Sequence, residues 1–345
     1  MPHRRRRAAV LRLGAPVLLA GAVLAAGCES NPLDGTPPTI EPATAAVSPP
    51  PATPPAGRVL PLAGRPTAAV FDAATASLAV LTPATGPGAA PATLTILGDP
   101  TRSVPLPGAA GPISGDGRGV VYAATRGGFF TVDMASATAK RTAIDGEADT
   151  EFTAVARRAD GRLVLGSADG TAYTLGADLA VTRTAALFSR VDAIVTVGDT
   201  AVVLDRGQTS VTALVPDSSR RQALRAGLGA TTLVADPRGW VLVTDTRGGQ
   251  LLVFGVDPLI ARQAYPIGDS PFGLTHSREL VWVSLTASNA VVGYDLSTGT
   301  PVEKVRYPTV QQPNSLAFDD SSGTLYVISG SGAGVQVIDD AAGQR

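Results

Sequence analysis

The sequence has very little cysteine and histidine, and its charges nearly cancel. It contains one Cys, two His, 28 basic and 29 acidic residues in 345 positions, and 5% of its residues are aromatic. A single Cys excludes an internal disulfide and a thiolate metal cage, and so few His argue against haem ligation or a multi-histidine metal centre. A formal net charge of -1 gives no general attraction to nucleic acid. We therefore expect no cofactor, no metal and no nucleic-acid partner.

The first 27 residues have the pattern of an export signal. Arg4 to Arg7 and Arg12 precede an uncharged run over residues 13–27, which is shorter than the roughly 20 residues of a membrane span. Sec and Tat export both remain open, because the run of Arg fits either pattern. Removing this segment takes away five Arg and no acid, which leaves 23 basic against 29 acidic residues and a mature net charge of -6.

The end of the uncharged run, Leu24-Ala25-Ala26-Gly27-Cys28, resembles the lipobox of bacterial lipoproteins. The resemblance implies cleavage before Cys28, a diacylglycerol on its sulfur and an acyl chain, such as palmitate, on the new amino group. Two or three acyl chains hold a protein stably on a bilayer, whereas one chain does not. We therefore expect lipid attachment at Cys28, with the membrane as a partner and the extracytoplasmic face of the cell membrane as the location.

Proline dominates the next segment, residues 28–57, which has nine Pro and few large apolar side chains. Such a composition buries too little surface to offset the entropy lost on ordering. The sequence predicts a disordered, extended tether with a reach of up to ~90 Å at about 3.1 Å per residue. Sugars on its Thr residues remain an alternative to a plain linker.

Beyond Gly57, short apolar runs rich in Val, Leu, Thr and Tyr alternate with Gly, Asp and Ser turns, which is typical of an all-β fold. The runs recur as a repeat. One equivalent position in the second strand of each unit is occupied by Ala79, Tyr122, Val164, Val202, Leu242, Trp282 and Tyr326. These positions lie 43, 42, 38, 40, 40 and 44 residues apart.

Seven units of about 40 residues predict a seven-bladed β-propeller over residues 58–345. The last unit ends after its third strand, and Arg58 to Leu62 looks like the fourth strands of the other units. We expect this N-terminal strand to complete the last blade and so to close the ring. Six or eight blades remain alternatives, because Pro112 interrupts the second unit and a long loop from Pro83 to Pro91 interrupts the first.

Three segments of the last unit, Pro313 to Phe318, Leu325 to Ser329 and Val335 to Asp339, resemble the YVTN-type repeats of YncE-like seven-bladed propellers. The resemblance implies the propeller fold and an extracytoplasmic location. It implies no particular activity, because propellers also serve as lactonases, quinoprotein dehydrogenases and surface-layer modules.

The sequence pairs no Ser and Asp with a histidine as a catalytic triad would need, and we expect no catalytic residue. His276 aligns with Phe318, Ala235 and Phe71 and is interpreted as a packed structural residue. Possible ligand contacts are the residues at the entrance of each inner strand, where the channel opens. They are Thr67, Thr153, Asp192, Thr231, Phe272 and Asn314, with Ala110 at the equivalent position of the second unit. Asp192 is the one acid among them, which argues against a calcium site of the lactonase type.

Together these features predict a lipid-anchored envelope protein, a monomer, whose propeller is a non-catalytic scaffold that binds a protein or an envelope component. Two alternatives stay open. One is a lactonase-type enzyme acting on a small polar substrate in the channel, and the other is a purely structural surface module.

Overall fold

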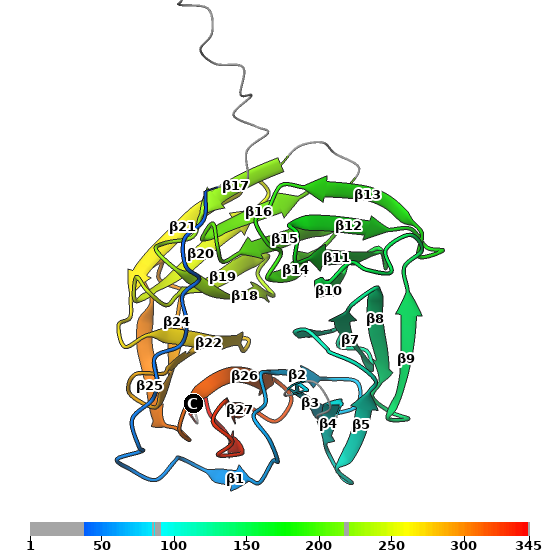
Figure 1. The fold of residues 1–345 in the computed structure, drawn as a ribbon. Helices are drawn as coiled ribbons and strands as arrows, with labels where there is room; N and C mark the ends of the chain where they lie inside the picture. Colours follow the sequence, from blue (N-terminus) through cyan, green and yellow to red (C-terminus); the bar gives the residue numbers. More distant parts are fainter. Residues whose placement is uncertain (1–37, 85, 87–90, 217–220, 344–345) are drawn as a thin grey trace, which may run out of the picture. The chain divides into compact units, whose positions relative to one another are not determined.

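The computed structural model describes residues 38–84, 86, 91–216 and 221–343, so the signal segment, Cys28 and residues 29–37 lie outside the described residues. Within those ranges the chain forms β-strands and no α-helix. The strands assemble into seven four-stranded antiparallel sheets, which are numbered here as blades in chain order (Figure 1).

The first three blades are each built from four consecutive strands. Blade 1 contains β2 (Ala68–Asp72), β3 (Ser77–Thr82), β4 (Ala92–Leu97) and β5 (Arg102–Leu106). Blade 2 contains β6 (Ile113–Gly115), β7 (Val120–Thr125), β8 (Gly128–Asp133) and β9 (Thr138–Ala143). Blade 3 contains β10 (Phe152–Arg157), β11 (Leu163–Ser167), β12 (Thr171–Leu175) and β13 (Val181–Ala186).

Blades 4 to 6 follow the same order, and blade 7 takes its fourth strand from the other end of the domain. Blade 4 contains β14 (Ala193–Val197), β15 (Thr200–Asp205), β16 (Ser210–Leu214) and β17 (Arg221–Arg225). Blade 5 contains β18 (Ala230–Asp236), β19 (Trp240–Asp245), β20 (Gln250–Val256) and β21 (Leu259–Pro266). Blade 6 contains β22 (Pro271–His276), β23 (Val281–Leu285), β24 (Ala290–Asp295) and β25 (Val302–Pro308). Blade 7 contains β26 (Pro313–Asp319), β27 (Thr324–Ser329), β28 (Val335–Ile338) and β1 (Arg58–Leu60).

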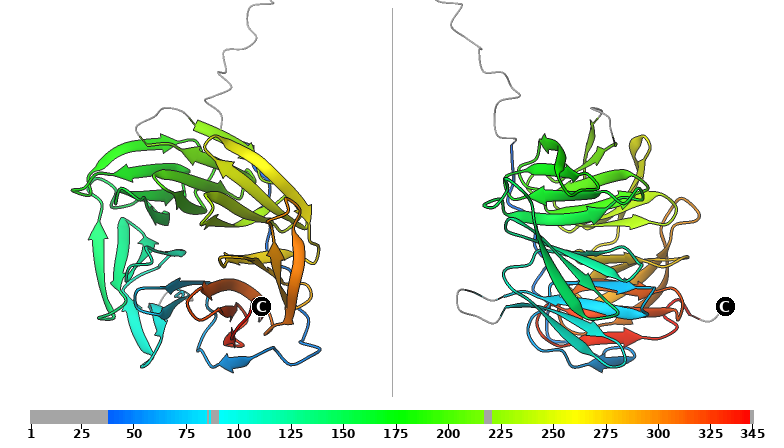
Figure 2. Two further views of the ribbon diagram at one scale, coloured as in Figure 1. Left: turned by 180° about the vertical axis from the view of Figure 1, so that it is seen from behind. Right: turned by 90° about the vertical axis from the view of Figure 1, so that its right-hand side faces the viewer.

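The first strand of each unit lies innermost, and each inner strand contacts the inner strands of both neighbouring blades, with β26 returning to β2 (Figures 1 and 2). The fold is a seven-bladed β-propeller, as the repeat predicted, and the alternatives of six or eight blades are wrong. Pro112 does not remove the second blade. It shortens the inner strand β6 to three residues.

Closure of the ring is also confirmed. β1 pairs with β28 in antiparallel register, with Arg58 opposite Val337 and Leu60 opposite Val335. The N-terminal strand therefore covers the edge that β28 would otherwise expose.

Apolar clusters fill the space between the blades, one for each of the seven neighbouring pairs. Between blades 6 and 7, for example, the fully buried ring of Trp282 stacks on Phe318 with 5.8 Å between ring centroids. Because a single blade would leave these faces exposed to water, each blade depends on its neighbours for burial.

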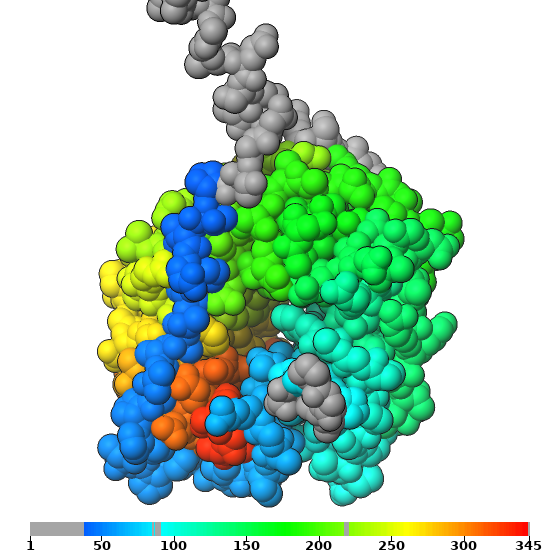
Figure 3. All heavy atoms as spheres, in the orientation of Figure 1, coloured from blue at the N-terminus to red at the C-terminus, as the bar shows by residue number. Residues whose placement is uncertain are grey.

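One prediction needs correction. The sequence predicted a disordered tether over residues 28–57, yet residues 38–57 form an extended segment, the strap, that lies along one face of the ring (Figures 2 and 3). Ala43 and Ser48 in its middle are only 4% and 3% exposed. The part that precedes residue 38 lies outside the described residues.

Hydrogen bonds from the loops of blades 4 to 7 hold the strap, and the blade 7 bond comes from Gln312. The N–H of Ile40 donates to the Gly207 carbonyl of blade 4 at 2.8 Å, and the Arg247 guanidinium of blade 5 donates to the Glu41 carbonyl at 2.7 Å. Further along, the Ser48 hydroxyl donates to the Thr286 carbonyl of blade 6 at 2.6 Å. The proline-rich composition gives the strap no core of its own, but side chains and backbone groups from the ring satisfy its polar backbone groups.

Candidate functional site in the central channel

The seven inner strands surround a central cavity of about 1160 Å³. Figure 3 shows the ring hollowed at its centre, next to the strap. All inner strands start on the strap side, since the strap is bonded to Ser270 and Gln312, which come directly before β22 and β26. The cavity is larger than the roughly 300–1,000 Å³ of most small-molecule sites.

Each residue proposed from the sequence as a channel-mouth contact lines this cavity. They are Thr67, Thr153, Asp192, Thr231, Phe272 and Asn314. For two of them the hydroxyl already has a partner within the protein. Thr153 donates to the Val191 carbonyl, and the hydroxyl of Thr231 bonds that of Thr246 at 2.5 Å. The Thr153 bond joins blade 3 to the segment that leads into blade 4, the Thr231 bond lies within blade 5, and Thr67 is exposed at the mouth.

Asp192 is the centre of a charged cluster at the mouth. Its carboxylate accepts the backbone N–H of Arg206 at 2.7 Å and lies 3.5 Å from Nε of Arg190. Nη2 of Arg190 also lies 3.7 Å from the carboxylate of Glu151. Burial raises the pKa of Asp192 above its ordinary value, while the Arg206 hydrogen bond and the charges of Arg206 and Arg190 act in the opposite direction. The carboxylate is thus held between two arginines.

Arginines are the lining residues that sequence reasoning missed. The described lining contains Arg126, Arg157, Arg190 and Arg206 against the acids Glu151, Asp192 and Asp320. Arg126 and Arg206 both directly follow the second strand of their blades, β7 and β15. The sequence comparison considered only the residue at the entrance of each inner strand. Comparing the residue that follows the second strand of each unit would also have found Arg126 and Arg206.

Arg206 also connects the channel to the strap. Its guanidinium donates to the carbonyl of Ala43, while its backbone N–H holds Asp192. Its Nε is buried with no hydrogen-bond partner among the described residues. A movement of the strap near Ala43 would therefore change the position of a cation that lines the channel.

His276 lies at the opposite end of the channel, because it is the last residue of β22 whereas Asp192 directly precedes β14. Burial lowers the pKa of His276, although the carboxylates of Asp236 and Asp320 raise it in part. The imidazole is therefore neutral at pH 7. Placed at opposite ends, His276 and Asp192 do not form an acid–base pair.

Among the residues that the structure describes, no group of three or more His, Cys, Asp or Glu side chains is placed to hold a metal ion. Within the same ranges, no helix has the length and apolar character to cross a membrane.

Comparison with known proteins places the fold among solved structures. No protein-family model and no curated protein sequence matches the chain. A chain of the mitotic checkpoint complex superposes with a TM-score of 0.69 at 13% identity, over 86% of this chain and 98% of that one. A streptogramin B lyase superposes with a TM-score of 0.64 at 10% identity, over 82% and 96%.

A catalytically inactive virginiamycin B lyase from Staphylococcus aureus, solved with quinupristin, gives a TM-score of 0.65 at 12% identity, over 81% of this chain and 97% of that one. The shared feature is the propeller. At such identities the fold alone is established, since one propeller architecture carries many unrelated functions.

Proposed function

We propose that this protein is a lipid-anchored, extracytoplasmic membrane protein whose propeller is a non-catalytic binding module. The observation that supports the binding role is the open channel of about 1160 Å³ with arginines at its mouth. The lining carries more basic than acidic residues although the mature chain carries an excess of acids. An anionic group of an envelope component is therefore the partner that the channel fits best.

The anchor part of the proposal rests on the sequence around Cys28. The strap adds a geometric condition, because Ile40 is bonded to blade 4 and only ten residues, 28–37, separate the expected lipid from the strap. Ten residues span at most about 36 Å, against the ~90 Å reach expected of a free tether. A lipid on Cys28 would thus keep the propeller close to the bilayer.

The anchor is tested by Cys28→Ala in intact cells. We expect the parent to be labelled by fatty acid and to sediment with membranes, and the variant to lose both properties. A variant that stays membrane-bound and labelled to the same degree as the parent would show that the anchor is elsewhere.

The channel is tested by cross-linking in intact cells. Arg190→Gln removes a mouth charge, Asp192→Ala and Asn314→Ala change its polar groups, and Arg225→Gln on the outer strand β17 is the matched control. We expect a specific adduct in the parent and in Arg225→Gln, and its loss in Arg190→Gln. Adducts that are equal in all variants would exclude the channel as the binding site, and the absence of any specific adduct in the parent would favour a purely structural module.

Turnover of a lactone by the purified parent would favour the lactonase alternative. In that case activity, and not only binding, should fall in Asp192→Ala.

A further inference from the structure

The charged residues of the strands are distributed unevenly between the inside and the outside of the ring. In each blade the fourth strand lies outermost, so β5, β9, β13, β17, β21, β25 and β1 form the lateral surface (Figures 1 and 2). Together these seven strands carry ten Arg or Lys residues and one acid, Glu303. We call this lateral surface the basic rim. None of its cations is among the described lining residues of the channel.

The remaining strands of the seven sheets show the opposite bias. They carry seven Asp and a single Arg, Arg157. The mature chain also has an excess of acids, so the positive rim does not follow from the overall composition. Charged side chains keep exposed edge strands from pairing with other chains, but like charges of either sign repel each other. Protection of the strand edges therefore does not explain why the rim is almost purely basic.

Several rim cations have no carboxylate partner. Three others, Arg58, Lys304 and Arg306, form ion pairs with nearby acids. Among the residues that the structure describes, no acid forms an ion pair with four exposed or half-buried cations of the rim, which are Arg102, Lys140, Arg141 and Arg262. The charge of these four side chains is therefore directed to solvent or to a partner.

Hydrogen bonds to backbone carbonyls hold some of these side chains in place without neutralising them. Nη2 of Arg102 donates to the Met134 carbonyl at 2.7 Å, and Nη2 of Arg141 donates to the Arg126 carbonyl at 2.8 Å. Lys140 and Arg141 are neighbours in β9, so their side chains leave opposite faces of that strand. Because β5 contacts β9 and β17 contacts β21, cations of adjacent blades follow one another along the rim.

From this arrangement we propose that the basic rim binds a linear anionic polysaccharide. A single exposed cation attracts an anion only weakly, and salt screens the attraction. The rim cations are spread around the ring and do not converge on a pocket, so a small anion reaches only one or two of them. A linear polymer with a charge on each repeat contacts many at once, and each further contact is then made within one complex.

Two other polyanionic partners fit the rim less well. The strap lies along one face of the ring, so a bilayer that meets that face does not follow the lateral surface (Figures 2 and 3). Proteins that bind single-stranded nucleic acid combine cations with exposed aromatic rings on which bases stack. The rim strands contain two aromatic residues, Tyr265 and Tyr307, and both are half-buried. The choice of a polysaccharide also rests on the extracytoplasmic location proposed above.

The test is fluorescence anisotropy of labelled polygalacturonate, a linear polysaccharide with one carboxylate per sugar, titrated with the mature protein. Labelled dextran is the neutral control. We expect saturable binding of polygalacturonate, no binding of dextran, and a steep loss of affinity as NaCl is raised. The galacturonate trisaccharide should compete far more weakly than the polymer, because it spans fewer cations. The measurement needs no membrane, so its outcome is independent of the Cys28→Ala test of the anchor.

Two triple variants with the same change in net charge locate the binding. The rim variant combines Lys140→Gln, Arg141→Gln and Arg262→Gln. The control variant removes three exposed cations from loops outside the rim, by Arg65→Gln, Arg118→Gln and Arg278→Gln. The rim variant should weaken polygalacturonate binding about tenfold or more, and the control variant by less than about twofold. Thermal midpoints close to that of the parent would show that both variants are folded.

Four results would overturn the proposal. The first is no saturable binding of polygalacturonate by the parent, and the second is an equal loss of affinity in the rim and control variants. The third is a trisaccharide that binds as tightly as the polymer, which would indicate a compact site. The fourth is tighter binding of an oligothymidylate with the same number of charges, which would make the partner a nucleic acid.

Discussion

The side-chain carbonyl of Gln312 accepts the backbone N–H of Ser48 at 3.0 Å, across 264 residues of sequence. The amide of the same side chain donates to the Ala46 carbonyl at 2.9 Å. Gln312 therefore pairs with the strap as the edge of a neighbouring β-strand would. These two hydrogen bonds explain how a segment without regular secondary structure stays fixed to blade 7.

Replacement of this side chain should release the middle of the strap and leave the ring folded. In Gln312→Ala the backbone groups of Ala46 and Ser48 lose their partners, at a cost of about 1–3 kcal/mol. We expect faster hydrogen exchange over residues 46–48 and little change elsewhere. Gln250→Ala at the start of β20 is the control, because its side chain makes none of the strap bonds. Equal exchange in both variants would mean that Gln312 does not hold the strap.

The propeller could be predicted from sequence because its determinants are local and repeated. Residues such as Leu242 and Trp282 recur at a fixed spacing inside short apolar runs, and both are fully buried between blades. The closing strand was predicted for the same reason, since Arg58 to Leu62 has the pattern of the other fourth strands, and its first three residues form β1.

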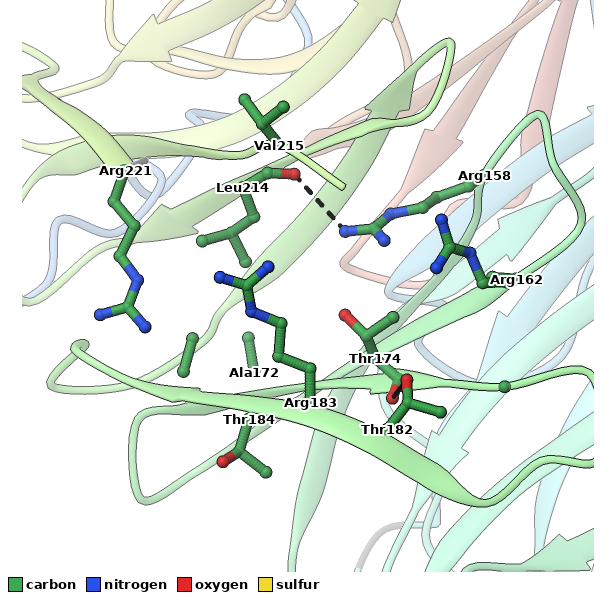
Figure 4. Close-up of a pocket in the computed structure, with 12 residues that line it drawn as sticks. Arg158, Arg162, Ala172, Thr174, Thr182, Arg183, Thr184, Leu214, Val215 and Arg221 are labelled. Carbon is green, nitrogen blue, oxygen red and sulfur yellow. Dashed lines mark hydrogen bonds between the residues drawn. The ribbon is translucent and has the colours of Figure 1, made fainter. Parts of the chain in front are cut away.

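The strap and a cavity of about 350 Å³ between blades 3 and 4 (Figure 4) escaped prediction because their determinants are not local. Ser48 is fixed by Gln312 and by Thr286, which lie far away in the sequence, and nothing in the composition of residues 38–57 records those partners. Arg158 and Arg221 face one cavity only because blades 3 and 4 are adjacent. Single charged residues in turns look the same in sequence whether they point to solvent or into a pocket.

Gln336 should be a strong contributor to stability, because it is fully buried in β28 and joins three segments. Its amide donates to the Ala56 carbonyl at 2.8 Å and to the Pro308 carbonyl at 3.0 Å, and its oxygen accepts the Val310 N–H at 3.0 Å. Gln336→Leu would leave the Ala56 carbonyl and the Val310 N–H unsatisfied, while the Pro308 carbonyl keeps its bond from the Ala56 N–H. The change should cost about 3 kcal/mol and lower Tm by several degrees.

The control for Gln336→Leu is the same change at Gln263, whose buried Oε1 has no hydrogen-bond partner among the described residues. Gln263→Leu should leave the thermal midpoint near that of the parent or raise it. If calorimetry gave the same decrease in Tm for both variants, the decrease would come from introducing leucine and not from losing the Gln336 hydrogen bonds.

Asp245 should matter even more to the loops of blade 5. Its fully buried carboxylate accepts the N–H groups of Leu228, Gly229 and Gly248 at 2.8–2.9 Å. Asp245→Ala removes all three acceptors and should lower the free energy of unfolding in urea by about 3 kcal/mol or more. The exposed Asp178 accepts the N–H of Ala180, so Asp178→Ala should change stability far less. Similar losses in the two variants would contradict the role assigned to Asp245.

His276 should give the domain a pH-dependent stability between pH 7 and 5. Burial lowers its pKa in the folded protein below about 6.5, the ordinary value, so the unfolded chain binds a proton more readily. The folded state is therefore at its most stable, with respect to this group, above pH 6.5, where His276 is neutral in both the folded and the unfolded chain. That stability is lost as the pH falls toward the lower pKa of His276 in the folded protein. The aligned positions Phe71 and Phe318 carry an aromatic ring, which makes His276→Phe a replacement of suitable shape.

Urea titrations of the mature protein at pH 7.5 and pH 5.5 measure this effect. The parent should be less stable at pH 5.5, and His276→Phe should lose that difference, since the only other His in the sequence is His3 in the expected signal segment. The carboxylate of Asp236 is paired with Arg238, at 2.6 Å between Oδ2 and Nη2, and the pKa of Asp236 lies below its ordinary value. Asp236 therefore changes its protonation state below this pH interval and contributes little to the difference. A parent and a variant with equal slopes over this interval would assign the pH dependence to a group other than His276.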